Sequence, residues 1–467
     1  MCGIYGQYST RGADPALIER MGRCLAHRGP DGSGSYHHGP LAFGAGRLAI
    51  IDLEAGVQPV FSEDRRVVIV YNGEIYNYRA LRAELERLGH CFATHTDTEV
   101  IVHGYENWGI GVLDHLRGMF ALGIWDEPNE QLWLARDRLG EKPLYYAPIA
   151  DGLLFASEIK ALLEHPDLPR NVNREALPYY LTIGYVPPPL TMFQGVEKLA
   201  PGELLCIDRQ GYSKRRYWQP HMDTTTPMDY GETVQQVRQT LMEAVEMRLM
   251  SDVPLGAFLS GGVDSTTVVA MMARAMGRPV QTFSVGFGYP AGSNADAKFN
   301  VDARYAAIAA RALKTDHHSI LIEEDARLRD VVPHLIYAMD EPIAQPAIIP
   351  TAYVSALARQ TGVPVMLAGD AGDELFAGYT AYRADQVLQR YLGLPEVLRQ
   401  NLLTPALESL PDRFHALRAL GQKSRNADSV RRYLTWMKIV ELDRLPPLLA
   451  DPELAAAAPT ALDSILR

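Results

Sequence analysis

The first part of the chain alternates short apolar runs with polar turn residues. Such runs lie at Arg66–Tyr71, Met119–Trp125 and Gln131–Ala135, and glycine, asparagine, aspartate and proline separate them. The stretches Asp14–Arg23 and Tyr78–Leu88 are predicted to be helices, the second because its leucines form one apolar stripe. The pattern predicts antiparallel sheets covered by helices.

Beyond residue 232 the pattern changes to alternating strands and helices. Thr233–Met250 has valine and leucine at helical spacing and is predicted to be a helix. The elements expected after it are a strand at Val253–Leu259, a helix at Ser265–Met276, a strand at Val280–Phe287, a helix at Ala303–Leu313, and strands at His318–Ile322 and Val363–Leu367. This order predicts parallel βαβ units, whose ligands bind at the carboxyl ends of the strands.

The change of pattern predicts two domains. The polar stretch Gln219–Gly231 has no periodicity and is the best linker candidate. We therefore expect a first domain at residues 1–210, a linker at 211–231 and a second domain at 232–467.

Composition narrows the possible partners and location. The net charge is -11 and lysine and arginine form no run, which argues against nucleic acid as a partner. No apolar run is long enough to cross a bilayer and no secretion signal is visible at the start, so no membrane partner is expected. The four cysteines are widely spaced and form no Cys-x-x-Cys pair, which indicates neither a zinc site nor a disulfide framework. A reducing cytoplasm fits best.

Cys2 is a candidate nucleophile. Removal of Met1 would make Cys2 the amino terminus, and its own α-amino group, with a usual pKa of about 7.7–8.0, could then deprotonate the thiol. This arrangement is typical of N-terminal-nucleophile hydrolases. Taken alone, a Met-Cys start is more often just a small residue at a disordered terminus, and the motifs that follow in the chain favour the nucleophile.

The sequence Leu-Ser-Gly-Gly-Val-Asp-Ser-Thr at 259–266 is a candidate phosphate-binding loop. It leads from a predicted strand into a predicted helix, where free backbone N–H groups can bind phosphate oxygens. The lysine and spacing of a Walker A loop are absent. The pattern instead resembles the pyrophosphate-binding loop of the ATP pyrophosphatase family, and the alternative is a purely structural glycine turn.

A second acidic element, Met366–Tyr379, follows another predicted strand. Asp264 and Asp373 would lie at strand ends of one sheet, where two carboxylates can share Mg²⁺ and offset triphosphate charge. The alternative is a solvated acidic turn that caps a helix.

Taken together, the motifs resemble those of the glutamine-dependent asparagine synthetases, a class II glutamine amidotransferase fused to an ATP pyrophosphatase domain. The motifs that carry the resemblance are, in order, Met1–Ile4, His27–Asp31, Gly46–Ile50, Tyr71–Asn77, Thr96–Glu99, Arg136–Tyr145, Ser157–Ala161, Ser260–Ser265, Phe283–Gly286, Thr315–His318, Met339–Pro342 and Gly369–Tyr379. The resemblance implies an αββα N-terminal-nucleophile sandwich followed by a parallel-sheet ATP pyrophosphatase domain of the adenine nucleotide alpha hydrolase-like type. It also implies a homodimer.

The resemblance also implies roles for individual residues. In the glutaminase, Cys2 attacks glutamine, Asn72 and Gly73 form the oxyanion hole, Arg47 holds the substrate carboxylate, and Asp97 with Glu74 holds its ammonium group. The implied ATP site consists of Leu259, Ser260, Gly261, Gly262, Asp264, Ser265, Ser284, Val285, Gly286 and Gly369, with Mg²⁺ on Asp264 and Asp373. The resemblance further implies that aspartate is adenylated and that ammonia channelled from Cys2 displaces AMP to give asparagine.

Two departures keep alternatives open. Asp370 stands where bacterial asparagine synthetases often have a glutamate that contacts the acceptor, so the acceptor could be another carboxylate, such as a sugar acid or a natural product. The family normally continues beyond the position of Arg467 into a helical region with basic residues, so the second domain is expected to be truncated. A truncated chain could instead be a nucleotide-responsive binding protein without synthetase turnover.

Overall fold

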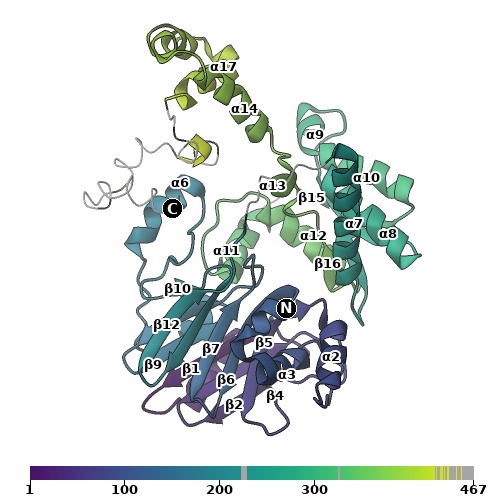
Figure 1. Cartoon of the computed structure of the whole chain (residues 1–467). Coiled ribbons are helices and arrows are strands. Elements are labelled where there is room, and N and C mark those ends of the chain that lie inside the picture. Colours follow the sequence, from purple (N-terminus) through teal and green to yellow (C-terminus); the bar gives the residue numbers. More distant parts are fainter. Residues whose placement is uncertain are drawn as a thin grey trace.

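The computed structural model describes residues 1–221, 229–323 and 327–425 and, further along, residues 428, 432–434, 436, 439, 440, 449 and 454. A part of the predicted linker, residues 222–228, therefore lies outside the described residues. Figure 1 shows a β-rich first half, a parallel sheet with helices after it, and a group of helices beyond that sheet. Among the described residues, no helix is both long and apolar enough to span a membrane.

The first half contains two six-stranded antiparallel sheets. One has the order β10-β8-β9-β1-β3-β2, formed by Glu197–Lys198, Tyr145–Ile149, Gly152–Ala156, Gly3–Ser9, Leu41–Arg47 and Gly32–His38. The other has the order β12-β11-β7-β6-β5-β4, formed by Gly211–Arg216, Glu203–Asp208, Gln131–Arg136, Gly118–Asp126, Val67–Ile75 and Val60–Phe61. The edge strand β12 begins at residue 211, so this sheet extends into the segment predicted as the linker.

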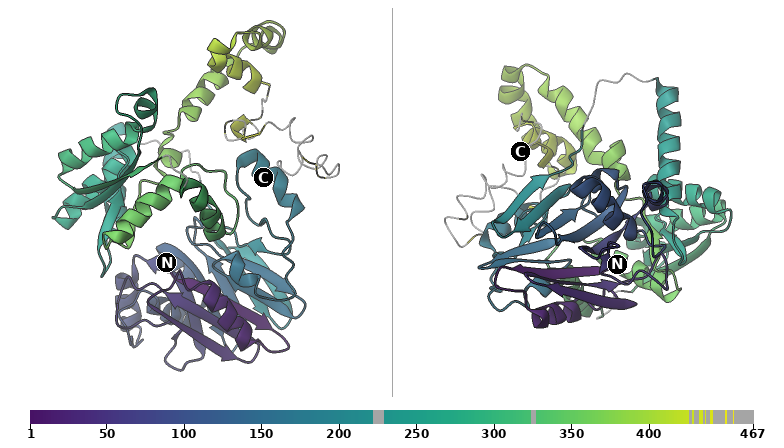
Figure 2. Two further views of the ribbon diagram at one scale, coloured as in Figure 1. Left: turned by 180° about the vertical axis from the view of Figure 1, so that it is seen from behind. Right: turned by 60° about the horizontal axis from the view of Figure 1, so that its bottom comes forward.

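The two sheets pack face to face and helices cover their outer faces (Figure 2). Strand pleating divides β1 between two layers, since Ile4 and Tyr8 lie in the core between the sheets while Tyr5 packs under helices α1 (Pro15–Cys24) and α5 (Ile159–Leu162). The second sheet is covered by α2 (Tyr78–Arg87), α3 (Glu99–Trp108) and α4 (Val112–His115). This is an αββα sandwich, and it confirms the fold predicted for the first half.

The second half contains a four-stranded parallel sheet in the order β15-β14-β13-β16. These strands are Asp316–Ile322, Gln281–Phe287, Leu255–Phe258 and Val365–Leu367. Helices α7 (Tyr230–Arg248), α8 (Val263–Met276) and α10 (Val301–Leu313) bury one face, and α12 (Ile348–Gln360) buries the other. The predicted parallel α/β domain is confirmed.

The remaining helices lie at the edges of these layers. They are α6 (Leu177–Ile183), α9 (Asn294–Phe299), α11 (Arg327–Met339), α13 (Gly372–Phe376), α14 (Thr380–Leu392), α15 (Glu396–Leu398), α16 (Thr404–Glu408) and α17 (His415–Lys423). In Figure 1, α14 and α17 extend away from the parallel sheet on the side opposite the sandwich.

Candidate active sites

Cys2 lies directly before β1, where pairing of β1 with β3 brings it beside Leu48. The Leu48 backbone N–H donates to Cys2 Sγ at 3.4 Å, and Cys2 Sγ lies 3.8 Å from the Leu48 carbonyl oxygen. Arg28 Nε donates to the Cys2 carbonyl oxygen at 3.0 Å. The thiol of Cys2 is therefore held by Leu48 at the end of β3, and its backbone carbonyl by Arg28 in the segment between α1 and β2.

Burial changes the acid–base behaviour of this end of the chain. It raises the pKa of the Cys2 thiol, while the Leu48 hydrogen bond opposes that rise. Burial also lowers the pKa of the Met1 α-amino group to about 6. An amino group in this environment is therefore mainly neutral at pH 7 and able to accept a proton.

Asn72 and Gly73 lie on β5, whose residue Val70 shares the core between the sheets with Ile4 of β1. The Asn72 side chain is 1% exposed, and its amide Nδ2 has no hydrogen-bond partner among the described residues. Because buried polar groups are almost always paired, this orphan donor is typical of a site that a ligand completes. At Gly73, a Cβ atom would lie 2.2 Å from the Met119 carbonyl oxygen, so only glycine fits there.

Two acidic residues, the half-buried Glu74 and the buried Asp97, lie near enough to Cys2 for their charges to act on its thiol. Asp97 Oδ2 accepts hydrogen bonds from Tyr71 Oη at 2.9 Å and from the Ile75 N–H at 2.8 Å. Burial raises the pKa of Asp97 to about 6. Burial, and then the charge of Asp97, raises the pKa of Glu74 well above its usual value. A cation between these two carboxyl groups would favour their charged forms.

Arg47 is the last residue of β3 and lies near Asp97. Its guanidinium donates to the carbonyl oxygens of Ile51 at 3.1 Å and Asp52 at 2.5 Å, and the side chain is 8% exposed. A Cβ atom on Gly56 would lie 3.1 Å from Arg47 Nη2 and 2.2 Å from Thr96 Cγ2. The close approach at Gly56 therefore holds Arg47 near the segment that carries Asp97. The structure brings the predicted glutaminase residues to one end of the sandwich.

The second candidate site is the loop between β13 and α8. Ser260 and Ser265 hold it closed, since their Oγ atoms are 2.9 Å apart and the Ser260 N–H donates to Ser265 Oγ at 3.3 Å. Gly261 has φ +78°, and a Cβ atom there would lie 2.3 Å from the Tyr305 carbonyl carbon. Gly262 then caps α8 without a side-chain hydrogen bond. The loop presents backbone N–H groups at a helix start, as the sequence predicts.

The acidic loop after β16 packs directly against this loop, because β16 pairs with β13. A Cβ atom on Gly369 would lie 2.6 Å from the Ser265 nitrogen, and one on Gly372 would lie 2.4 Å from Asp264 Cγ. Asp264 therefore contacts the acidic loop, and Asp373 stands one residue further, in the first turn of α13. Asp370 is exposed beside them.

The other predicted nucleotide residues lie on the neighbouring strand. The Leu259 N–H donates to the Phe283 carbonyl oxygen at 2.9 Å, which places Ser284, Val285 and Gly286 at the carboxyl end of β13. Ser284 Oγ lies 3.1 Å from His317 Nε2. The carboxyl edge of the parallel sheet thus gathers the predicted phosphate, nucleoside and acceptor residues.

Both halves of the chain match known protein families. Residues 1–218 match the glutamine amidotransferase domain family, and residues 236–455 match the asparagine synthase family. A relative in Methanocaldococcus jannaschii, named as a putative glutamine-hydrolysing asparagine synthetase, is 33% identical over 427 residues, which cover 85% of this chain and 79% of the relative. The chain belongs to the glutamine-hydrolysing asparagine synthetase family.

Two further relatives show how much of a family member's length this chain covers and how such members are named. Asparagine synthetase (glutamine-hydrolysing) 1 of Bacillus subtilis is 37% identical over 410 residues, which cover 86% of this chain. The chain spans 63% of that relative's length. Amidase chyE of Penicillium rubens is 32% identical over 405 residues, covering 83% of this chain and 59% of the relative. The family therefore includes relatives with different names for their activity.

Two asparagine synthetase motifs without a predicted role meet between the halves of the chain. Lys160 Nζ lies 2.8 Å from Asp340 Oδ1 and also pairs with Glu158, whose carboxylate accepts from Arg28 Nη1 at 2.8 Å. Arg28 in turn holds the carbonyl oxygen of Cys2. A continuous series of charged contacts therefore links the backbone of Cys2 to the second half of the chain.

Lys142 also lies at the first site, although the sequence motifs assign no role to it. Its side chain is 7% exposed, its Nζ lies 3.3 Å from Met1 Sδ, and burial lowers its pKa. Glu74 lies near enough to oppose that shift. The only sequence signal was its place within the asparagine synthetase motif Arg136–Tyr145.

Proposed function

We propose that the chain is an ATP-dependent amidotransferase that hydrolyses glutamine at Cys2 and transfers the ammonia to an activated carboxylate. With aspartate as the acceptor, ATP, aspartate, glutamine and water give asparagine, glutamate, AMP and diphosphate. The observation that carries the proposal is the buried, unpaired amide of Asn72 in the region of Cys2, within a chain of this family. The site lacks one acceptor for that donor, and a developing oxyanion supplies it.

In the glutaminase reaction, the Cys2 thiolate attacks the side-chain carbonyl carbon of glutamine. The α-amino group that Met1 removal exposes accepts the thiol proton and returns it to the leaving ammonia, and water then hydrolyses the thioester to glutamate. Asn72 Nδ2 and the Gly73 N–H stabilise the oxyanion. Glu74 and Asp97 hold the substrate ammonium group, and Arg47 holds its carboxylate.

In the synthetase reaction, the 259–266 loop holds the leaving diphosphate through its N–H groups, and Ser284–Gly286 border the adenosine. The Asp264 carboxylate lies against Gly372 of the acidic loop, and the Asp373 carboxylate, in the first turn of α13, lies against Gly378. Both are oxygen donors, which a hard divalent cation prefers. Mg²⁺ there would offset the triphosphate charge. The acceptor carboxylate oxygen attacks the α-phosphorus, diphosphate leaves, and ammonia displaces AMP from the acyl adenylate.

Product analysis tests this function. The full chain is incubated with glutamine, ATP, Mg²⁺ and aspartate, or with sugar acids and other carboxylic acids in place of aspartate. We expect diphosphate, AMP and the amide in equal amounts, and asparagine when aspartate is the acceptor. Amide formation only with another acid would replace aspartate as the acceptor. Nucleotide binding without acid-dependent diphosphate release would support a binding protein instead.

Asn72→Ala is expected to lower kcat for glutamine hydrolysis by about 10²–10³-fold, because one oxyanion donor is lost. The fold should survive, since the substitution removes a buried donor that has no partner. Steady-state kinetics and thermal melting measure the two effects. Asn129→Ala is the matched control, because Asn129 pairs with Asp126 outside the site. An unchanged kcat in Asn72→Ala would contradict the role of Asn72.

Asp370→Glu is expected to change the KM or kcat for the acceptor acid without a matching change for ATP or glutamine. The carboxylate moves by roughly 1.5 Å, one carbon–carbon bond, and an oriented acceptor is sensitive to such a shift. Kinetics with aspartate and a panel of acids provide the measurement. Asp302→Glu, at an exposed position on α10, is the control. Identical acceptor kinetics in Asp370→Glu and the parent would refute the role of Asp370.

A further inference from the structure

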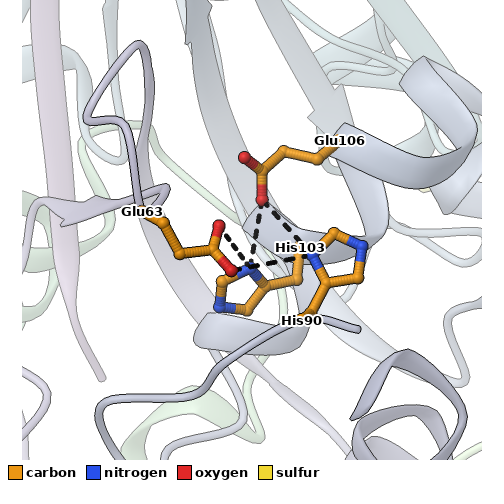
Figure 3. Close-up of side chains that lie close together, drawn as sticks. All are labelled: Glu63, His90, His103 and Glu106. Carbon is orange, nitrogen blue, oxygen red and sulfur yellow. Dashed lines mark hydrogen bonds and ion pairs between the residues drawn. The ribbon is translucent and has the colours of Figure 1, made fainter. Parts of the chain in front are cut away.

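A cluster of two histidines and two glutamates lies in the first domain (Figure 3). Glu63 comes from the turn between β4 and β5, His90 from the segment after α2, and His103 and Glu106 from one face of α3. Three separate segments therefore direct their side chains toward one point. None of the four is used in the proposed reaction.

Four separations between the donor atoms lie near those of a tetrahedral metal site. His103 Nδ1 lies 3.0 Å from Glu106 Oε2 and 3.5 Å from Glu63 Oε2. His90 Nδ1 lies 3.7 Å from Glu106 Oε2 and 3.9 Å from Glu63 Oε1. Zinc bonds to imidazole nitrogen and carboxylate oxygen are about 2.0–2.2 Å, which gives a tetrahedron with edges of about 3.3–3.6 Å. These four separations bracket that length, although two of them use different oxygens of Glu63. One ligand atom from each of the four residues lies within 4.8 Å of the other three, so small side-chain shifts would bring all four to an ion.

The surroundings of His103 support this assignment independently. Its side chain is 1% exposed, and its other ring nitrogen, Nε2, lies 3.5 Å from Glu99 Oε1. Glu99 is itself held by hydrogen bonds from the Ala93 N–H at 2.6 Å and from the Thr94 N–H at 2.8 Å. Among the described residues His103 Nε2 makes no hydrogen bond, so Glu99 stands at ion-pair distance behind it, in the position that the outer partner of a metal-ligating imidazole occupies.

The cluster is also reachable from solvent. The Glu63 side chain is 43% exposed and that of Glu106 is 22% exposed, while the histidines line the inner side. A cation can therefore enter from the carboxylate side with little movement of the backbone. Nitrogen and oxygen donors of this kind suit first-row divalent cations better than Mg²⁺ or Ca²⁺, which prefer oxygen alone.

We propose that Glu63, His90, His103 and Glu106 bind one first-row divalent cation, Zn²⁺ in the first place. The ion would join the turn before β5, the segment after α2 and helix α3. Since α3 begins two residues after Asp97, the ion would also fix the helix that follows the proposed ammonium-binding segment. Its role is structural, and the site is separate from both Cys2 and Asp264.

Zinc titration of the chelator-treated full chain tests the site, with Zn²⁺ alone as the probe. We expect one Zn²⁺ per chain by calorimetry and a higher melting temperature with Zn²⁺, because the ion binds the folded state. In Glu106→Gln and in His90→Asn the affinity should fall at least about 10-fold, and the zinc-dependent shift in melting should be lost. The His37→Asn variant, which loses an exposed imidazole of β2, should behave as the parent.

Two outcomes would overturn the proposal. If the parent binds no Zn²⁺, the two histidines and two glutamates contact one another without a metal ion. If zinc binding persists unchanged in both ligand variants, the ion occupies another group, such as the Cys2 thiol. Glutamine hydrolysis by the same samples, measured without added metal, reports on the proposed function separately.

Discussion

Cys2→Ala is expected to reduce glutamine hydrolysis by at least about 10⁴-fold, to the background level. The variant loses the proposed nucleophile, and removal of a nucleophile typically costs about this much or more. Glutamate release in a coupled assay measures the effect. Synthesis with ammonium salts in place of glutamine should continue, because the second site does not use the thiol. Intact-mass measurement of the parent should show that Met1 is absent.

The matched control is Cys24→Ala, which removes a partly buried thiol from α1 in the same domain. It should retain glutamine hydrolysis. Thermal melting of both variants checks that the domain folds, since Cys2 lies at the end of a sheet and contributes little to the core. Undiminished hydrolysis by Cys2→Ala would rule out the nucleophile assignment.

Local patterning predicted much of the fold because most elements show a polar face. Helix α2 places Tyr78, Leu81 and Leu85 in the core and leaves polar residues outside, so its stripe was visible in the sequence. Helix α3 was missed. Residues 99–105 are all buried, so this segment has no exposed polar face, and its Val-Ile-Val run looks like a strand.

The segment predicted as the linker includes a strand that the pattern of residue types does not show. Strand β12 at Gly211–Arg216 is exposed along its whole length, so it shows no alternation of apolar and polar residues. Its pairing with β11 depends on backbone hydrogen bonds, which the residue types do not reveal. A short polar segment of this kind is predicted as linker although it completes a sheet.

Contacts within a local motif could be expected from the sequence, whereas contacts between distant segments could not. The phosphate loop and the Cys2 region are local motifs, and the structure gathers them as expected. The contacts from Arg28 to Glu158 and from Lys160 to Asp340 join residues 130 and 180 positions apart. The His and Glu cluster likewise combines three segments, and spacing along the chain gives no sign of it.

Asp264→Asn and Asp373→Asn are each expected to lower acid-dependent diphosphate release by about 10²-fold or more. Each removes one carboxylate charge from the proposed Mg²⁺ site, and a bound cation contributes several kcal/mol to stabilising phosphoryl charge. The Mg²⁺ concentration needed for half-maximal rate should rise in both variants. Diphosphate release with ATP, ammonium and the acceptor acid measures these effects.

The structure supplies a matched control for this pair. Asp316 lies at the opposite, amino end of the same sheet, so Asp316→Asn removes an equal charge without touching the phosphate loop. It should leave the rate and the Mg²⁺ dependence unchanged. Glutamine hydrolysis should survive in all three variants, because Cys2 belongs to the other domain. Normal diphosphate release by Asp264→Asn would mean that this carboxylate, although it contacts the acidic loop at Gly372, does not hold the cation.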